Sequence, residues 1–231
     1  MSKTVDLRAA DGHALSAYLA EPHAAARGAV VVIQEIFGIT DHIRSICEDY
    51  AGQGYLVIAP SMFDRLELGV ELPYGQDGVS RGAILAKKLD LNAALLDMQA
   101  AIDHVAAAAG HVGLVGYCYG GTLAWLAAAQ ATGLSCVASY YGSHVVNLLD
   151  RTPQVPTILH FGARDKMIPL TAVDKIRAAH PQVPVHLYAA DHGFNCSERE
   201  SYNADAATLA RERTLALFLE HVAGMSAALA S

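Results

Sequence analysis

Short hydrophobic runs alternate with longer amphipathic segments along the chain, and their periods predict its secondary structure. Residues 5–8 and 14–19 alternate apolar and polar positions on either side of Asp11-Gly12-His13, which predicts two strands joined by a turn. Residues 28–33 form a continuous and mainly β-branched run, which is typical of a strand buried on both faces. The chain is therefore expected to begin with a hairpin that is followed by a buried strand.

The rest of the chain repeats the order of strand and helix. Further strands are predicted over residues 55–59, 112–116, 136–140, 157–161 and 185–188. Helices are predicted over residues 42–53, 80–109, 122–131, 171–179 and 204–222, with a break near 89–92 and an irregular loop over 61–78. Asp41 is the expected N-cap of the first helix, and Gly54 lies where that helix should end. This order predicts an α/β fold, with a mostly parallel sheet covered by helices on both faces, in a single domain over residues 1–231.

Composition narrows the classes of partner. The 231 residues are 53% hydrophobic and carry a net charge of −7, without a cluster of lysine or arginine. Because nucleic acids and anionic membrane surfaces bind clustered basic residues, we expect neither as a partner. Residues 1–6 are polar rather than signal-like, no apolar run could span a bilayer, and the four cysteines lack CxxC spacing. We therefore expect a soluble cytoplasmic protein with free thiols, a small-molecule ligand and a monomeric or small homo-oligomeric state.

The strongest chemical signal is Gly116-Tyr117-Cys118-Tyr119-Gly120-Gly121, between a predicted strand and a helix. The nucleophile elbow of hydrolases has the pattern Gly-x-Ser-x-Gly in this context, and here cysteine replaces serine. The helix N-terminus points N–H groups at the thiol and favours the thiolate. Cys118 is therefore the candidate nucleophile, and a buried cysteine in a glycine-rich turn is the alternative.

An acid and a histidine follow Cys118 in the order that this fold uses. Asp165 lies in the loop after one strand, and His192 follows the last strand. His192 can take the thiol proton, and Asp165 can hold the imidazole in the required tautomer. Asp191 competes for the acid role, but adjacent residues on an extended segment point in opposite directions. We therefore favour Asp165.

The loop after the first buried strand, Gln34-Glu35-Ile36-Phe37-Gly38, is the expected source of one oxyanion-hole N–H group. The backbone N–H groups of Ile36 and Tyr119 are the candidates. Glu35 is unusual beside such a site, because a carboxylate repels developing negative charge. It either contacts the thiol and sets its protonation, or it is a solvated loop acid.

These residues resemble the dienelactone hydrolase family, the carboxymethylenebutenolidases. The resemblance covers nearly the whole chain and is carried by the loop at Glu35, the elbow at Cys118, Tyr140-Tyr141-Gly142, Gly162-Ala163-Arg164-Asp165, His192-Gly193-Phe194 and Arg213-Thr214-Leu215. It implies an α/β-hydrolase fold and a Cys118–His192–Asp165 triad that hydrolyses an enol-lactone through an acyl-enzyme, without a cofactor. It also implies that Glu35 holds the resting thiol and takes its proton when substrate arrives.

The resemblance further implies two arginines that bind a substrate carboxylate. Arg81 lies in the segment of one, whereas Cys196 occupies the position of the other and cannot pair with a carboxylate as arginine does. Arg199 is the candidate replacement, and surface charge is the alternative for both arginines. The histidines outside the triad, including His42, show no metal-ligand spacing, so no metal is expected.

Two functions are compatible with these patterns. The first is a thiol hydrolase that acts on a small lactone or ester, with dienelactone-type enol-lactones favoured. The second is a hydrolase-like protein that binds a ligand or senses oxidation at Cys118 without turnover. The ordered triad favours the first, because a binding module needs no such constellation.

Overall fold

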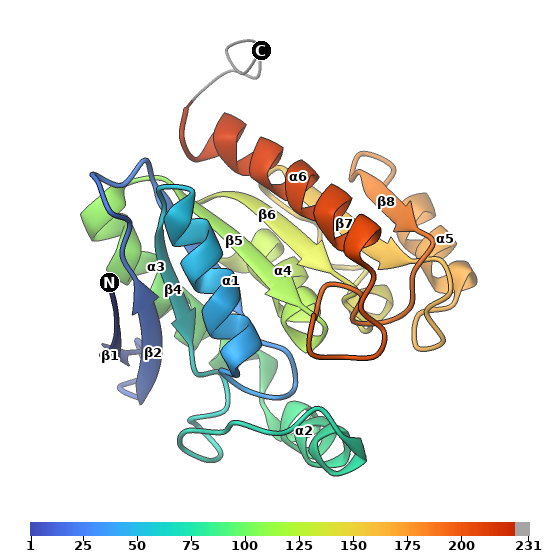
Figure 1. Ribbon diagram of the computed structural model, residues 1–231, viewed down its shortest axis with the longest axis horizontal. Coiled ribbons are helices and arrows are strands. Elements are labelled where there is room, and N and C mark those ends of the chain that lie inside the picture. The colour runs from blue at the N-terminus through green and yellow to red at the C-terminus, as the bar shows by residue number, and fades with distance from the viewer. Residues whose placement is uncertain (225–231) are drawn as a thin grey trace.

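The predicted hydrophobic runs become strands of one sheet in the computed structural model, which describes residues 1–224 (Figure 1). Residues 225–231, the end of the predicted domain, lie outside the described residues. The strands are β1 (Ser2–Arg8), β2 (Ala14–Ala20), β3 (Ala29–Ile33), β4 (Leu56–Pro60), β5 (Val112–Tyr117), β6 (Leu134–Tyr140), β7 (Thr157–Gly162) and β8 (Val185–Tyr188). They lie in the order β1-β2-β4-β3-β5-β6-β7-β8. β2 is antiparallel to both β1 and β4, and β4 to β8 form a parallel sheet.

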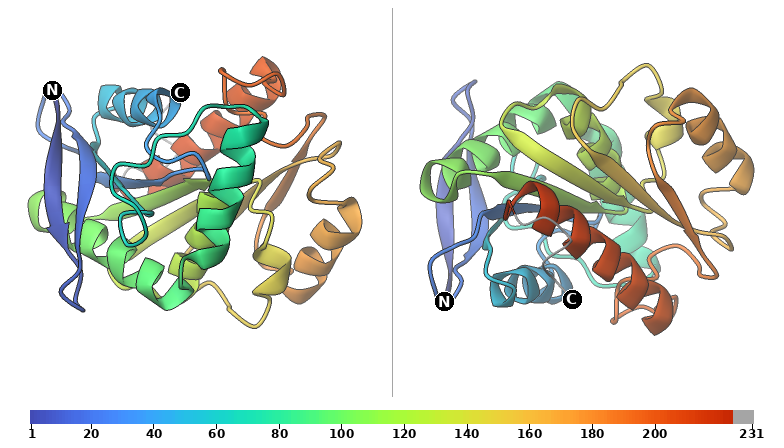
Figure 2. Two further views of the ribbon diagram at one scale, coloured as in Figure 1. Left: turned by 90° about the horizontal axis from the view of Figure 1, so that it is seen from below. Right: turned by 90° about the horizontal axis from the view of Figure 1, so that it is seen from above.

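Helices cover both faces of this sheet, as the sequence predicts (Figure 2). They are α1 (Asp41–Gly52), α2 (Gln76–Lys88), α3 (Leu91–Ala109), α4 (Tyr119–Gln130), α5 (Leu170–Ala179) and α6 (Ala204–His221), with a short 3₁₀ helix over Val145–Asn147. Val30 and Val32 of β3 pack in the core beneath α1 and α6, whereas Val31 and Ile33 pack beneath α3 and α4. This alternation explains why the strand is apolar at every position.

Several helix starts differ from the sequence prediction. Thr40 rather than Asp41 is the N-cap of α1, because its side chain accepts a hydrogen bond from the N–H of Ile43. α2 begins at Gln76, inside the segment predicted as a loop, and α4 begins at Tyr119 instead of residue 122. The break near 89–92 is confirmed, since Asp90 caps α3 directly after α2 ends.

The parallel strands place their following loops at one end of the sheet. The loops after β3, β5, β7 and β8 therefore meet there, beside α2 (Figure 1). Ligands of open parallel sheets bind outside this edge. Within the part of the chain that the structure describes, no helix is long and apolar enough to cross a membrane.

Candidate active site

Cys118 occupies a strained turn between β5 and α4. Its φ of 55° and ψ of −115° are uncommon for a residue with a side chain, and its N–H donates to the carbonyl oxygen of Tyr140 at 3.0 Å. A Cβ on Gly116 would clash with the carbonyl of Gly120, and one on Gly120 would clash with the carbonyl of Ile33. The glycines therefore allow the close approach that fixes the thiol at the end of the sheet.

The structure brings the three predicted triad residues into contact. The Nε2 atom of His192 lies 3.2 Å from the Sγ atom of Cys118, and its Nδ1 atom lies 2.7 Å from Oδ2 of Asp165. The other Asp165 oxygen accepts hydrogen bonds from the N–H groups of Met167 and Ile168 at 2.8 and 3.1 Å. Both ring nitrogens of His192 thus have one partner each, and the acid is fixed by its own loop.

The surroundings of His192 favour its protonated form. Burial alone lowers the pKa of this histidine, but the Cys118 sulfur and the hydrogen-bonded Asp165 carboxylate outweigh burial and raise the pKa to about 10. Such an imidazolium stabilises a thiolate beside it. The pair can therefore supply a nucleophilic sulfur at neutral pH.

Asp191 does not join this arrangement. Its side chain is half exposed and lies 3.9 Å from Arg164, whereas the side chain of Asp165 is fully buried. The preference for Asp165 as the partner of His192 agrees with this geometry.

Cys118 opens into a largely apolar cavity of about 630 Å³. Ile36 and Tyr119, the two candidate oxyanion residues, line it beside the thiol. Within residues 1–224, neither of their N–H groups donates to a backbone carbonyl. Val79 and Ala83 of α2 form part of the opposite wall. A cavity of this size accommodates a small organic molecule.

The comparisons with known proteins identify the family of this chain. The family model of the dienelactone hydrolase family matches residues 15–222. The chain belongs to the dienelactone hydrolase family. It is 32% identical over 225 residues to the carboxymethylenebutenolidase of Pseudomonas putida, which covers 93% of this chain and 95% of the relative. A Synechocystis protein assigned as a carboxymethylenebutenolidase is 34% identical, with coverage of 88% of this chain and 91% of the relative.

Solved structures show the same relationship. A Klebsiella pneumoniae protein assigned as a dienelactone hydrolase superposes with a TM-score of 0.83 at 28% identity, over 95% of this chain and 99% of that protein. The resemblance inferred from the sequence is thereby confirmed, as is the α/β-hydrolase fold. This dienelactone hydrolase family member is a hydrolase that acts on esters.

The two candidate substrate-binding arginines are not brought together in this family member. Arg81 forms an ion pair with Glu67 on the surface, and its side chain is 55% exposed. Arg199 lies with its Nη1 atom 3.8 Å from Oε1 of Glu35 and stacks on the ring of Phe37. Among the described residues that line the cavity, Lys87 carries the only Lys or Arg charge.

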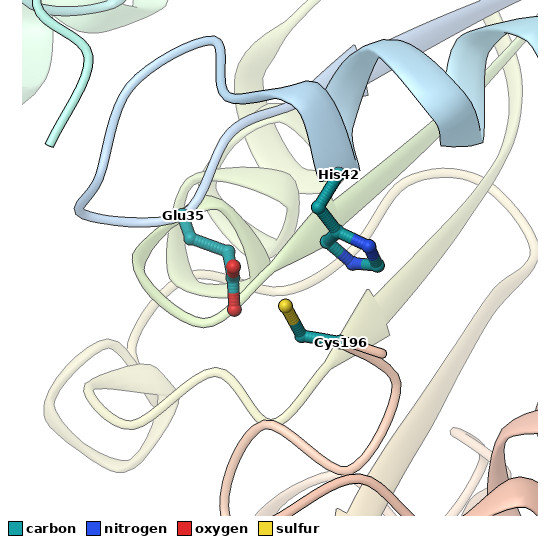
Figure 3. Close-up of side chains that lie close together, drawn as sticks. All are labelled: Glu35, His42 and Cys196. Carbon is teal, nitrogen blue, oxygen red and sulfur yellow. The ribbon is translucent and has the colours of Figure 1, made fainter. Parts of the chain in front are cut away.

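Glu35 is fully buried, which the solvated-loop alternative did not anticipate. Neither of its oxygens has a hydrogen-bond partner among residues 1–224, so it does not contact the Cys118 thiol in this arrangement. Burial raises the pKa of Glu35, and the charge of Arg199 opposes that effect. The carboxylate instead faces His42 and Cys196 (Figure 3).

His42 and Cys196 were not singled out as a site by the sequence. Burial, with the charge of Arg199 behind it, lowers the pKa of His42 to about 4, and burial raises the pKa of Cys196 to about 11. The three side chains come from the loop after β3, the first turn of α1 and the loop after β8. No sequence spacing links these positions, and only the fold brings them together.

Several other aromatic and histidine residues pack in the core or border the site. Trp125 is fully buried and donates to the carbonyl of Leu148. His160 is buried between the hydroxyls of Tyr188 and Thr214. Of the tyrosine pair, Tyr140 donates to or accepts from Thr214 in the core, whereas the ring of Tyr141 lies 5.1 Å from that of His192. One tyrosine thus packs and the other borders the site.

Proposed function

We propose that the chain is a cysteine-dependent hydrolase of a small lactone or ester. The carrying observation is the continuous contact from Cys118 through His192 to Asp165 at the end of the sheet. A thiol, an imidazole and a fixed carboxylate in this order form the minimal set for nucleophilic acyl transfer. Membership of the family and the apolar cavity at the thiol support the same activity.

In the proposed reaction the Cys118 thiolate attacks the substrate carbonyl carbon, and the C–O bond to the leaving alcohol breaks. His192 gives its proton to the leaving oxygen, which in a lactone stays attached to the acyl group. Water then attacks the thioester while His192 takes its proton, the C–S bond breaks, and the acid is released as the Cys118 thiolate and the His192 imidazolium are regenerated. The N–H groups of Ile36 and Tyr119 are proposed to stabilise the oxyanion in both steps.

Glu35 is proposed to hold the resting thiol and to accept its proton as substrate arrives. Its burial next to the site and the absence of a hydrogen-bond partner among the described residues support such a role. In the present arrangement the carboxylate makes no hydrogen bond to the thiol, so this role requires its side chain to move toward Cys118.

The cavity lining favours an uncharged substrate over the carboxylate of a dienelactone. Apolar side chains such as Val79, Leu148 and Met167 dominate the walls. Arg81 pairs with Glu67 and Arg199 pairs with Glu35, so neither is free to bind a substrate carboxylate in this arrangement. Loss of the Glu35 charge would release Arg199 from its pair. We therefore propose a small neutral ester or lactone as the preferred substrate.

Cys118→Ala tests the proposed nucleophile. We expect turnover of an activated ester to fall by at least about 10³-fold, because alanine removes the proposed nucleophile. Alkylation of the wild-type thiol should give the same loss, and the acyl-enzyme should be detected on Cys118 by mass spectrometry after rapid quenching. Cys136→Ala is the matched control. Cys136 is buried near the start of β6, away from the strand ends that carry the triad, so its substitution should leave turnover unchanged. Turnover that survives in Cys118→Ala, or a panel of lactones and esters without any turnover, would contradict the proposal and leave ligand binding or thiol sensing.

A further inference from the structure

Three metal-ligating side chains of different types converge beside the candidate active site. They are Glu35, His42 and Cys196, referred to below as the Glu35–His42–Cys196 cluster (Figure 3). One carboxylate oxygen, one imidazole nitrogen and the sulfur all lie within 4.8 Å of one another. The cluster is separate from the triad, because it shares no residue with Cys118, His192 and Asp165.

Each member of the cluster is buried and polar, and Glu35 lies 3.8 Å from the guanidinium of Arg199. Glu35 and Cys196 are fully buried, and His42 is 4% exposed. Both oxygens of Glu35 and both ring nitrogens of His42 lack a hydrogen-bond partner within residues 1–224. Buried polar atoms are normally paired, because each unpaired one costs about 1–3 kcal/mol. Four such atoms in one place therefore point to a ligand that would satisfy them.

The chemistry of the donors selects the class of ligand. An anionic ligand is excluded by the carboxylate, whereas oxygen, nitrogen and sulfur together are a set that Zn²⁺ and its neighbours bind. Zinc bonds of about 2.0–2.3 Å place tetrahedral ligands roughly 3.5 Å apart. The observed limit of 4.8 Å thus requires shifts on the order of 1 Å, which side-chain rotation can supply.

We propose that the Glu35–His42–Cys196 cluster is a binding site for a thiophilic divalent transition metal ion, with Zn²⁺ as the first candidate. The Cys196 thiol loses its proton to solvent as the metal–sulfur bond forms, and the fourth position is left for water. Arg199 is the positive partner that the ion displaces. Its guanidinium lies 3.8 Å from Glu35 and stacks on the Phe37 ring, and metal binding would require it to turn away from Glu35.

An access route reaches the cluster at His42. His42 lines a second cavity of about 270 Å³ between α1 and α6. Asp49, Asn195 and Ser197 also line it and offer oxygen ligands to a hydrated cation on its way in. An ion can thus reach His42 without passing through the apolar substrate cavity.

Metal binding would also regulate the proposed hydrolase. A coordinated Glu35 carboxylate cannot turn to the Cys118 thiol, so Zn²⁺ should slow turnover. This consequence rests on the proposed function, whereas the metal site itself does not. The decisive measurement is therefore binding rather than activity.

The test uses the full chain carrying Cys118→Ala, which removes the competing triad thiol, after treatment with a chelator. We expect one Zn²⁺ per chain by equilibrium dialysis, and one Co²⁺ whose spectrum shows the charge-transfer absorption of a cobalt–thiolate bond. Adding Cys196→Ser should abolish that absorption, and adding His42→Gln should weaken binding at least about tenfold while the absorption persists. Arg199→Ala should tighten binding, because it removes a competing cation.

Matched controls separate a built site from adventitious binding. Cys47→Ala and Cys136→Ala remove other buried thiols and should change neither stoichiometry nor spectrum. Far-UV circular dichroism of each variant establishes that it is folded before metal is added. Binding weaker than to a denatured chain, or binding that is unchanged by both Cys196→Ser and His42→Gln, would overturn the proposal. If the metal-free wild-type enzyme hydrolyses none of the lactones and esters, that result would contradict the proposed function and leave the metal site untouched.

Discussion

His192 uses both ring nitrogens at once, and this fixes its protonation. The N–H at Nδ1 donates to Asp165 at 2.7 Å, which leaves Nε2 to exchange a proton with Cys118 at 3.2 Å. The raised pKa of about 10 follows from the Cys118 sulfur and the Asp165 carboxylate, against the lowering effect of burial. Removal of the Asp165 charge should therefore change the pKa of His192 directly.

Asp165→Asn should lower both the rate and the alkaline limit of activity. Asparagine removes a charge that stabilises the imidazolium, so the pKa of His192 falls and the proton is lost at lower pH. We expect kcat/KM for an activated ester to fall by about 10²–10⁴-fold, with the alkaline limb of the pH profile displaced to lower pH. A pH series of initial rates measures both effects.

Asp191→Asn is the matched control for that substitution. It makes the same chemical change in the residue next to His192, but its side chain is exposed and points to Arg164. We expect rates and pH profile close to wild type. A larger effect from Asp191→Asn than from Asp165→Asn would show that the acid role has been assigned to the wrong aspartate.

At the scale of elements, the junction of β5 and α4 positions the Cys118 nucleophile. Gly120, in the first turn of α4, lies so close to β3 that an added Cβ would overlap the carbonyl oxygens of Ile33 and Gln34. The same contact brings the elbow against the loop that carries Ile36. Packing at this junction therefore sets the distance between the thiol and the proposed oxyanion donors.

Gly120→Ala should separate those elements and impair both stability and turnover. Overpacking of this kind costs about 1–3 kcal/mol, which lowers the Tm of a chain of this size by roughly 2–10 °C. Turnover measured well below the Tm should fall further than the loss of folded protein explains. Gly52→Ala in α1 is the control, because nothing lies within 4 Å of its added Cβ and alanine is the better helix former. Equal behaviour of the two variants would contradict the packing argument.

The buried strands could be predicted from the sequence because two covered faces require apolar residues at every position, as in β3. The start of α2, in contrast, could not be predicted from the sequence. Gly78 and Gly82 weaken its helical pattern, yet each is needed for close packing: an added Cβ would overlap the carbonyl of Pro73 or of Ile36. Gly78, which lies in the predicted loop, is thus required by a tertiary contact of a helix, as is Gly82 in the predicted helix.

At the scale of the whole molecule, the triad could be predicted from the sequence pattern, whereas the other site residues depend on tertiary contacts. Cys118, Asp165 and His192 each follow a strand, so the order of strands is sufficient to bring them together. The Glu35–His42–Cys196 cluster and the partners of Arg81 and Arg199 depend on side-chain directions, which no periodicity encodes. The sequence therefore predicts the chemistry of the site better than its specificity.

The negative net charge of the molecule should affect which substrates it accepts. The chain carries a net charge of −7, and Lys87 is the only Lys or Arg among the described residues that line the cavity. A carboxylate-bearing lactone should therefore be repelled on approach and meet no bidentate arginine at the thiol. We expect kcat/KM to be at least about tenfold higher for a neutral lactone than for its carboxylate analogue of equal size.

Salt distinguishes repulsion by the whole molecule from a poor local fit. Raising the ionic strength from about 0.01 M to 0.15 M shortens the screening length from about 30 Å to 8 Å, so kcat/KM for the anionic lactone should rise while that for the neutral one stays constant. Lys87→Gln should reduce turnover of the anionic substrate alone. If the anionic lactone is preferred and salt reduces its turnover, a cation must reach the cavity. Arg199 is then the residue to test, because its guanidinium lies 3.8 Å from Glu35, in the loop that carries the proposed oxyanion donor Ile36.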